Sequence, residues 1–410
     1  MIRPQIASNC KDQQDISSSA SFNDVNRLST DINAKLNKLR LQTFRNYEIA
    51  HLVLESDTVV LVGPNGSGKT NIIEAASMFS PGKGLRSSQL SEQSNVKGKG
   101  GWSIFMEIKT ANGITKLGTG ISSSQIMEGR ARQCRVDGEF LKSPRQFSDY
   151  IGIIWLTPQM DRLFIGQRTE RRKFFDKLVY LIEPSHDQNI KDYDRLIMQR
   201  NRVLMGIDDK KIWLDKIEKQ ISKIAANIII SRQIATNRLN KIMDSEVKNN
   251  LFPSAKIIMR EQLGDTNTRS SIIEIEEQLQ KLFYQSRARD RETYRTNVGP
   301  HRTDFTLYYK KNDMYAENCS TGEQKNLLVS LILAEARVYQ EINNDVSPIL
   351  LLDEITAHMD DKRVSNLFEQ IGEIGSQTWL TGTSEHLFDY ISDKTDIFNI
   401  SNGKLAQRVL

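Results

Sequence analysis

The residues Gly63-Pro64-Asn65-Gly66-Ser67-Gly68-Lys69-Thr70 decide the fold class of this 410-residue chain. They match the pattern G-x-x-x-x-G-K-[ST], in which the glycines let backbone N–H groups turn inward around phosphates. An apolar run at Thr58–Val62 precedes the loop, and a helical run follows it from Lys69 to about Phe79. A strand, a phosphate loop and a helix in this order predict a P-loop domain, because the helix N-terminus adds its positive dipole end to the site.

The loop residues have expected parts in a nucleotide site. Lys69 should reach the β- and γ-phosphates, and the Thr70 hydroxyl should ligate Mg²⁺. A glycine-rich turn with an incidental lysine would not account for the strand before the loop and the helix after it. The predicted nucleotide-binding residues of this segment are Gly63, Pro64, Asn65, Gly66, Ser67, Gly68, Lys69, Thr70 and Asn71.

Residues 348–354 (PILLLDE) have the form of a Walker B strand. A buried apolar strand would hold Asp353 and Glu354 at its carboxyl end, where ligands bind in open α/β sheets. We expect Asp353 to hold Mg²⁺ through water and Glu354 to deprotonate the attacking water. Glu354 and Lys69 are therefore the predicted catalytic residues. Any buried strand entering a loop could look similar, but the P-loop favours the Walker B interpretation.

Residues 320–325 (STGEQK) lie between these two motifs and open an apolar helical run, residues 327–338. Serine and glycine at a helix start are ordinary capping residues. The alternative is an ABC signature, in which the serine and the helix N-terminus contact the γ-phosphate of ATP bound to the other subunit. The position of the segment before the Walker B strand favours the signature. Its predicted nucleotide contacts are Ser320, Gly322, Glu323 and Gln324.

The spacing of the motifs indicates a divided domain. Asp353 lies 284 residues after Lys69, and residues 168–294 carry helical periodicity that includes a short heptad seam. The seam residues are Leu214, Ile217, Ile221, Ile224 and Ile228. We predict an α/β fold: an ABC-type P-loop ATPase head with a mixed sheet, split by an inserted, mainly helical lobe. The expected parts are a disordered tail (1–35), the first part of the head with antiparallel hairpins (36–166), the lobe (167–295) and the second part of the head (296–410).

Composition places the chain among ordinary globular proteins, with 38% hydrophobic and 26% charged residues. We expect a cytoplasmic protein without membrane contact, because no apolar run is long enough to span a bilayer and the three cysteines are far apart. Of the net charge of +5, residues 161–300 carry +7, from 27 Lys and Arg against 20 Asp and Glu. This middle segment fits a polyanion partner, although a solvated helical surface would look the same.

The order of motifs along residues 38–410 resembles the RecF family. The matching stretches are residues 39–47 (LRLQTFRNY), 63–75 (GPNGSGKTNIIEA), 171–176 (RRKFFD), 199–201 (QRN), 299–304 (GPHRTD) and 320–325 (STGEQK). The resemblance implies a weak, DNA-stimulated ATPase that acts as a switch with ATP and Mg²⁺. It implies an ATP-closed homodimer that binds single-stranded and duplex DNA at gaps and helps load the recombinase, with RecR and RecO as partners.

The chain departs from the family pattern at several places. Glu354 stands where many members have a second aspartate, and Gln159 follows Pro158 where an acid is frequent. Gln159 could still ligate Mg²⁺ or its water. Asp360 matches the D-loop aspartate and is assigned to the nucleotide site, whereas His358 has no expected role. Residues 379–383 (WLTGT) end without a switch histidine, so Thr383 or Ser384 would have to sense the γ-phosphate.

Two further expectations concern basic residues. Arg168, Arg171, Arg172 and Lys173 would lie near nucleotide or DNA, or else on a solvated helix face. The resemblance also implies a role for His301 and Arg302.

The alternatives to a RecF-like function are an SMC-like chromosome or double-strand-break repair ATPase and, less favoured, the ATPase subunit of an ABC transporter. The short seam and the absence of a Cys-x-x-Cys hook disfavour the first, and the 284-residue spacing disfavours the second.

Overall fold

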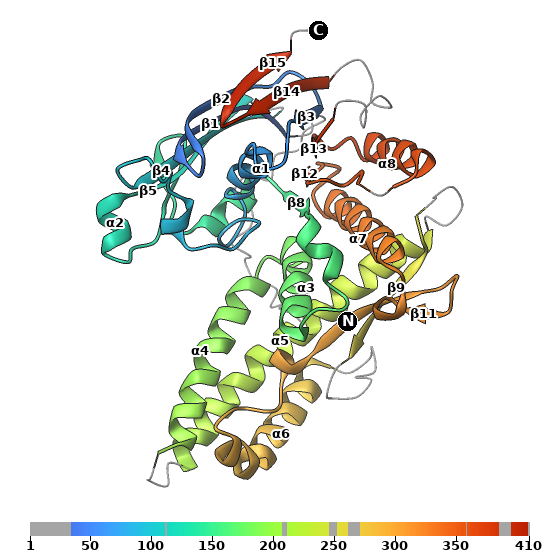
Figure 1. Ribbon diagram of the computed structural model, residues 1–410. Helices are drawn as coiled ribbons and strands as arrows, with labels where there is room; N and C mark the ends of the chain where they lie inside the picture. Colours follow the sequence, from blue (N-terminus) through green and yellow to red (C-terminus); the bar gives the residue numbers. More distant parts are fainter. Residues whose placement is uncertain are drawn as a thin grey trace, which may run out of the picture.

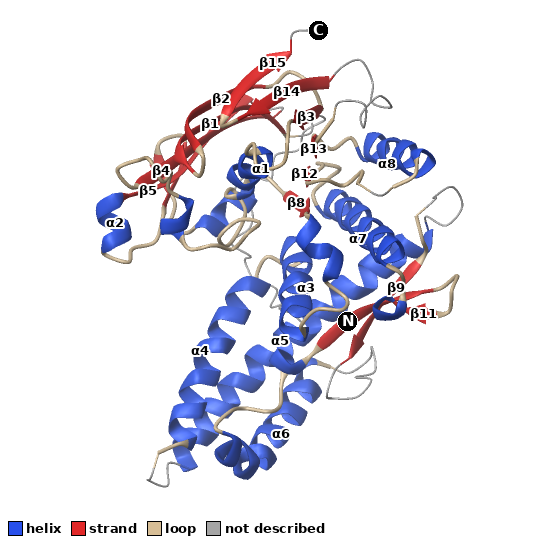
Figure 2. Cartoon of the chain, viewed as in Figure 1, coloured by secondary structure: helices blue, strands red, loops and turns tan. Residues whose placement is uncertain are grey.

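The computed structural model describes residues 34–110, 113–206, 211–245, 252–260, 271–357, 359–384 and 395–408. His358, and all of the predicted tail except Ala34 and Lys35, lie outside this part. The described residues form two six-stranded sheets, one three-stranded sheet and a group of long helices (Figures 1 and 2). The predicted α/β head with a mixed sheet and a helical insertion is confirmed.

The mixed sheet has the strand order β15-β14-β3-β13-β12-β8. Its neighbours pair in parallel except for β14 and β15, which form an antiparallel hairpin. The strands are β3 (Thr58–Val62), β8 (Ile153–Leu156), β12 (Ile349–Leu352), β13 (Thr378–Gly382), β14 (Thr395–Ser401) and β15 (Lys404–Arg408). Four of these strands, β3, β13, β12 and β8, are almost wholly apolar and buried, as expected for parallel strands covered on both faces.

Helices cover both faces of this sheet. One face packs with α7 (Thr321–Ile342) and α8 (Asp361–Ile374), and the opposite face packs with α1 (Lys69–Ser77). Successive residues of each strand enter different cores, so that Val60 and Leu350 belong to the first and Leu61 and Leu351 to the second. The P-loop therefore leaves a rigid sheet that is fixed from both sides.

A second sheet, antiparallel throughout, encloses α1. Its order is β2-β1-β4-β5-β6-β7. The strands are β1 (Lys35–Phe44), β2 (Tyr47–Val53), β4 (Gly101–Thr110), β5 (Gly113–Ser122), β6 (Gln133–Val136) and β7 (Glu139–Phe140). Alternating residues such as Leu39, Leu41, Ile104 and Met106 point into the core shared with α1. Short segments between the sheets are η1 (Leu90–Gln93), α2 (Ser123–Met127), η2 (Pro144–Asp149) and η3 (Pro158–Arg162).

The inserted lobe extends away from the head (Figure 1). It contains α3 (Arg168–Ile182), α4 (His186–Leu204), α5 (Lys211–Ser245) and α6 (Ile272–Thr293). The heptad residues of α5 face a core with α4 and α6, where Ile221 and Ile228 are fully buried. The seam thus belongs to a bundle within one chain.

The sequence did not predict one strand of this lobe. β9 (Ala255–Arg260) lies within the run read as helical, and it pairs with β10 (Asp304–Tyr309). β11 (Met314–Tyr315) completes a three-stranded sheet, and η5 (Pro300–Arg302) and η6 (Ala316–Asn318) flank it. No helix in the described ranges is long and apolar enough to cross a membrane.

A candidate nucleotide site at the carboxyl edge of the mixed sheet

The P-loop turns tightly between β3 and α1 because two of its glycines have no room for a side chain. A Cβ at Gly63 would lie 2.2 Å from the Ile400 carbonyl oxygen. Gly68 has a φ of +118°, and its Cβ would lie 2.6 Å from the Tyr47 hydroxyl. Only glycine adopts this close approach and this left-handed backbone without strain. The loop therefore packs closely against β14 and the antiparallel sheet.

Asparagine side chains hold the loop from outside the motif. Asn46 Nδ2 donates to the Ser67 carbonyl at 3.0 Å, and Asn71 Nδ2 donates to Asn46 Oδ1 at 2.7 Å. The Gly403 N–H also donates to the Ser67 carbonyl, at 3.2 Å. Asn71 thus acts on the loop through Asn46. Sequence reasoning did not assign Asn46 to the site, although it lies in the stretch 39–47 that carries the family resemblance.

Lys69 is buried beneath the loop. Its Nζ donates to the carbonyl oxygens of Gly63 at 2.7 Å and Pro64 at 3.1 Å. Burial lowers the pKa of Lys69, while the nearby carboxylates of Glu354 and Asp353 act in the opposite direction. The Lys69 ammonium group therefore lies within the loop where phosphates are predicted to bind. The two carboxylates are close enough to favour its charged form.

Three polar side chains meet where three neighbouring strands end and α1 begins: Thr70, Asp353 and Thr381. The Thr70 hydroxyl donates to Asp353 Oδ2 at 2.9 Å, and the Thr381 hydroxyl donates to Asp353 Oδ1 at 2.7 Å. They meet because β3, β13 and β12 run in parallel and end at one edge. Thr381 is completely buried. Its role was missed, because a threonine at the end of an apolar strand carries no motif.

Oxygen donors of this kind suit Mg²⁺, which prefers one or two protein ligands together with phosphate oxygens and water. In the described ranges no group of three or more His, Cys, Asp or Glu side chains could hold a metal. Thr70 and Asp353 fit such a sparse site. Gln159 leaves the sheet from the same edge, since β8 pairs with β12 at Leu156 and Leu352. Its side chain is exposed and makes no hydrogen bond to Thr70 or Asp353, which bond to each other.

Glu354 adopts an uncommon backbone conformation, with a φ of +51°. Such left-handed geometry in a residue other than glycine persists where neighbours enforce it, and it is frequent at functional sites. Its N–H donates to the Thr381 hydroxyl at 2.8 Å, and its carbonyl accepts from Lys325 Nζ at 3.3 Å. Lys325 also donates to the Ala357 carbonyl at 2.7 Å. The last residue of the STGEQK segment therefore supports the loop after Walker B.

The first turn of α7 is capped and exposed. Ser320 accepts from the Glu323 N–H at 3.4 Å, and Glu323 Oε2 accepts from the Ser320 N–H at 2.9 Å, which is a capping box. Ser320 and Gly322 are exposed, and a Cβ at Gly322 would meet nothing within 4 Å. Gln324 is buried and donates to the Cys319 carbonyl at 2.9 Å. The capping interpretation is thus confirmed, and the signature interpretation of this exposed turn stays a prediction.

The D-loop aspartate also caps a helix. Asp360 precedes α8 and accepts from the Arg363 N–H at 3.0 Å. Thr383 and Ser384 follow β13 at the same edge of the sheet, and Thr383 is exposed.

Two arginines of the basic motifs, Arg171 and Arg200, form ion pairs within the chain. Arg171 makes two hydrogen bonds to Asp304, at 2.8 and 2.7 Å, which join α3 to β10. Arg200 is fully buried and contacts Glu218 at 2.9 Å and Asp290 at 2.7 Å. The motifs RRKFFD and GPHRTD, which are far apart in sequence, are thus joined by an ion pair, whereas Arg200 of QRN pairs with acids on α5 and α6. For Arg171 this contact replaces the solvated helix face, while a nucleotide or DNA neighbour stays a prediction.

Both ring nitrogens of His301 also have hydrogen-bond partners within the chain. Its Nδ1 lies 2.6 Å from the Tyr193 hydroxyl and its Nε2 lies 3.0 Å from the Thr296 carbonyl. Burial lowers the pKa of His301 to about 4, so the ring is neutral at physiological pH. Arg168, Lys173 and Arg302 are exposed, whereas Arg172 lies near the Thr303 carbonyl at 3.5 Å.

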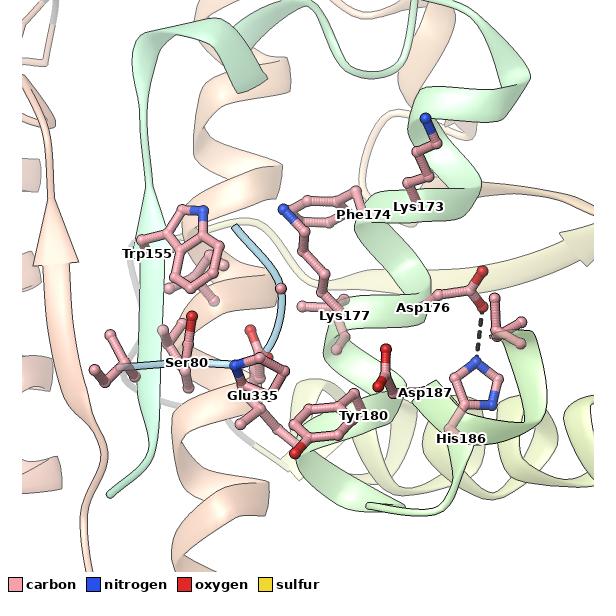
Figure 3. A pocket seen from close by; sticks show the side chains of 18 of the residues that line it. Ser80, Trp155, Lys173, Phe174, Asp176, Lys177, Tyr180, His186, Asp187 and Glu335 are labelled. Carbon is pink, nitrogen blue, oxygen red and sulfur yellow. Dashed lines mark hydrogen bonds and ion pairs between the residues drawn. The ribbon is translucent and has the colours of Figure 1, made fainter. Parts of the chain in front are cut away.

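A separate pocket of about 270 Å³ lies between β8, α3 and α7, away from the P-loop (Figure 3). Figure 3 shows the Lys177 side chain running towards Trp155, and its Nζ lies 5.0 Å from the indole ring centre. Glu335 of α7 lines the pocket and is 2% exposed, and its Oε2 has no hydrogen-bond partner. Burial raises the pKa of Glu335 to about 8.

This buried acid predicts a pH-dependent stability. The unfolded chain releases the Glu335 proton near the ordinary value of 4.5, whereas the folded chain keeps it to about pH 8. The free energy of unfolding should therefore fall as pH rises between these values. Glu335→Gln should remove this dependence on pH. Near pH 9 its free energy of unfolding should exceed that of the wild type by an amount on the order of several kcal/mol. Urea unfolding at about pH 5 and pH 9 measures this, with the exposed Glu341→Gln as control. Parallel pH profiles for wild type and Glu335→Gln would contradict it.

Comparisons with known proteins agree with the fold and the motifs. The family model described as "AAA domain, putative AbiEii toxin, Type IV TA system" matches residues 59–383. A protein of Rhizobium leguminosarum bv. trifolii named "DNA replication and repair protein RecF" is 37% identical over 372 residues, which cover 91% of this chain and 98% of that protein. A protein of the same name from Agrobacterium fabrum is 38% identical over 90% of this chain and 98% of its own length.

Solved structures share the fold. The structure described as the recombination mediator protein RecF-ATPrS in the RecFOR pathway has a TM-score of 0.81 at 21% identity, over 93% of this chain and 100% of that chain. The corresponding RecF-ATP structure has a TM-score of 0.80 at 22% identity, over 92% and 98%. A SmcHead bound to the C-winged helix domain of ScpA reaches only 0.52 at 16% identity, over 92% and 98%.

Proposed function

The chain belongs to the RecF family of DNA replication and repair proteins, and from this premise we propose that it is an ATP-gated DNA clamp of recombinational repair and replication restart. The observation that carries the proposal is the convergence of Lys69, Thr70, Asp353 and Glu354 at one sheet edge. This is the set of groups that phosphoryl transfer requires, because its catalysis consists mainly of positioning and charge neutralisation.

In this proposal ATP binds with its phosphates inside the P-loop. The loop N–H groups and the N-terminus of α1 face the phosphates. Lys69 exchanges its bonds to the Gly63 and Pro64 carbonyls for phosphate oxygens, which requires only a short movement of Nζ. The remaining loop residues, from Asn65 to Asn71, shape the cradle.

Thr70, Asp353 and Gln159 are the residues that would hold Mg²⁺, either directly or through water. The ion would neutralise charge on the β- and γ-phosphates. In the structure the Thr70 hydroxyl donates to the Asp353 carboxylate at 2.9 Å, and Mg²⁺ would replace this bond. The Thr381 hydroxyl keeps Asp353 oriented when that bond is broken.

Glu354 is proposed as the general base. Its carboxylate would accept the proton of the water that attacks the γ-phosphate, and its backbone is held by Thr381 and Lys325. Since Thr383 or Ser384 stands in place of a switch histidine, we propose slow hydrolysis. Slow hydrolysis suits a switch that DNA stimulates.

Dimerisation would complete each site. The exposed turn at Ser320 and Gly322, together with Glu323 and the D-loop residue Asp360, would face the nucleotide held by the partner subunit. The buried Gln324 would support this turn from behind, through its bond to the Cys319 carbonyl. ATP would then bind across the interface and close two heads, and hydrolysis would open them. The relatives that share 98% of their length with this chain are RecF proteins, and this supports the RecF reading over the SMC-like and transporter alternatives.

The proposed partners are single-stranded and duplex DNA at gaps, a second copy of the chain, and mediator proteins of the RecR and RecO type, acting in the cytoplasm. The net charge of +7 in residues 161–300 supports a polyanion partner.

DNA affinity measured with ATP, with ADP and without nucleotide tests the proposal, at one salt concentration because phosphate contacts dominate such binding. We expect ATP to tighten binding by about tenfold or more over ADP, which corresponds to a coupling free energy of about 1.4 kcal/mol. Equal affinities in the three states would overturn the gate, and undetectable binding in all three would overturn the DNA-binding function.

A further inference from the structure

The outer face of the antiparallel sheet carries a row of side chains in cross-strand register. Arg40 of β1 pairs with Phe105 of β4, Phe105 with Gly118 of β5, and Gly118 with Arg135 of β6. Arg135 pairs in turn with Phe140 of β7. Residues directly opposite each other point to the same face of an antiparallel sheet. The row therefore carries two cation–aromatic pairs, Arg40 with Phe105 and Arg135 with Phe140, with Gly118 between them.

The aromatic members of this row do not belong to the interior. Phe140 is 61% exposed, and the Arg135 guanidinium lies 4.0 Å from its ring centre. Phe105 is half-buried, yet the hydrophobic cores of the described residues do not include it. An aromatic ring that stabilises no core is available to a ligand.

A groove of about 590 Å³ lies over β1, β4, β5 and β6, and Phe105, Gly118, Gly120 and Arg135 are among the residues that line it. At Gly120 a Cβ would lie 2.7 Å from the Trp102 carbonyl oxygen, so the fold requires glycine there. At Gly118 a Cβ would meet nothing within 4 Å and the backbone is not left-handed. The fold does not require glycine at 118. Its effect is to keep the groove open between Phe105 and Arg135.

The charge on this face is positive. Alternation along the strands directs five cationic side chains outward: Lys38, Arg40, Lys109, Lys116 and Arg135. The acid Glu107 points to the same side, and it pairs with Lys38 at 2.9 Å. In the part of the chain that the structure describes, Arg40, Lys116 and Arg135 make no ion pair. Cations without an ion-pair partner, beside aromatic rings outside the cores, complement a polyanion with exposed bases.

We propose that this sheet face binds single-stranded nucleic acid, with bases stacked on Phe105 and Phe140 and phosphates at Arg40, Lys116 and Arg135. The inference rests on the proposed DNA-binding function and assigns a location to the binding of the single strand. Strand spacing of about 4.8 Å separates the two rings by about 14 Å, which leaves room for bases that are unstacked from each other. A duplex keeps its bases stacked, so the rings favour a single strand.

The experiment measures affinity of the full chain, with ATP, for a labelled oligothymidylate of about 20 nucleotides and for a duplex of equal length. Phe105→Ala should weaken single-strand binding about 5- to 150-fold and change duplex binding less than about 2-fold. Phe105→Tyr keeps the ring and should bind as the wild type does. Arg40→Gln should reduce the slope of log affinity against log salt by about 0.7 for the single strand.

Gly118→Leu provides a second, independent test. It should fill the groove and weaken single-strand binding about fivefold or more, because stacking on Phe105 is blocked. Gly372→Leu is the matched control, since Gly372 on α8 also has open space and no left-handed backbone. Thermal unfolding verifies that each variant is folded, and Gly118→Leu retains the test if Phe105→Ala does not fold.

The outcomes are distinct. If the wild type binds neither nucleic acid in any nucleotide state, the proposed function itself fails. If the wild type binds the single strand and both Phe105→Ala and Gly118→Leu bind equally well, the location is wrong while the function stands. If both variants lose single-strand and duplex binding to the same extent, the face reads the phosphate backbone and the stacking proposal is overturned.

Discussion

Replacement of Glu354 by glutamine should slow ATP hydrolysis by about 10²- to 10⁴-fold, the range that a positioned general base contributes. The amide keeps the shape of the side chain but cannot accept the proton of the attacking water. The backbone contacts to Thr381 and Lys325 do not involve the carboxylate, so the loop should keep its conformation. ATP binding should persist, and the closed dimer should therefore accumulate.

Two measurements check this expectation. Phosphate release under saturating ATP reports hydrolysis, and size-exclusion chromatography with ATP reports the dimer. Glu341→Gln, on the exposed surface of α7, is the matched control for the loss of one carboxylate. A hydrolysis rate equal to that of the wild type in Glu354→Gln would remove Glu354 from the catalytic role.

Replacement of Lys69 by alanine should weaken ATP binding by about 10²-fold or more, because charge-assisted hydrogen bonds to phosphate oxygens are each worth about 1.5–3 kcal/mol. Among the described residues, Nζ makes hydrogen bonds only to the carbonyls of Gly63 and Pro64, so the variant should keep its fold. Without bound ATP the variant should also fail to dimerise.

Titration calorimetry with ATP measures the loss directly, and Lys362→Ala on the surface of α8 controls for the removal of a lysine. Thermal unfolding without nucleotide should give similar midpoints for Lys69→Ala and wild type. Unchanged ATP affinity in a folded Lys69→Ala protein would refute the assignment of the loop as a phosphate cradle.

The strands of the nucleotide site could be predicted from sequence because burial on both faces leaves a simple signal. Thr58–Val62 and Ile349–Leu352 are short apolar runs bounded by polar or glycine residues, and the structure has strands at those bounds. The helix that begins after Ser320 was predictable for a similar reason, since a capping box precedes an apolar run. In both cases the information is local in the chain.

Contacts between distant segments could not be read in this way. The bond from Thr381 to Asp353 depends on β13 lying beside β12. The ion pair between Arg171 and Asp304 joins residues 133 positions apart, and from sequence alone an arginine in a basic run looks solvated. β9 was read as part of a helical segment because its partner, β10, follows the whole of α6.

The central claim, that ATP is held between the P-loop of one subunit and the α7 N-terminus of another, is tested by mixing Ser320→Arg with Lys69→Ala. Ser320→Arg keeps its own P-loop but places a bulky charge where the partner's γ-phosphate would dock. A mixed dimer then has one intact composite site, formed by the P-loop of the first variant and the Ser320 turn of the second. The account predicts ATP-dependent dimerisation and hydrolysis in the mixture that neither variant shows alone. If Ser320 only caps α7, its loss would cost about 1 kcal/mol of stability, and two folded variants would show no recovery on mixing, which would contradict the account.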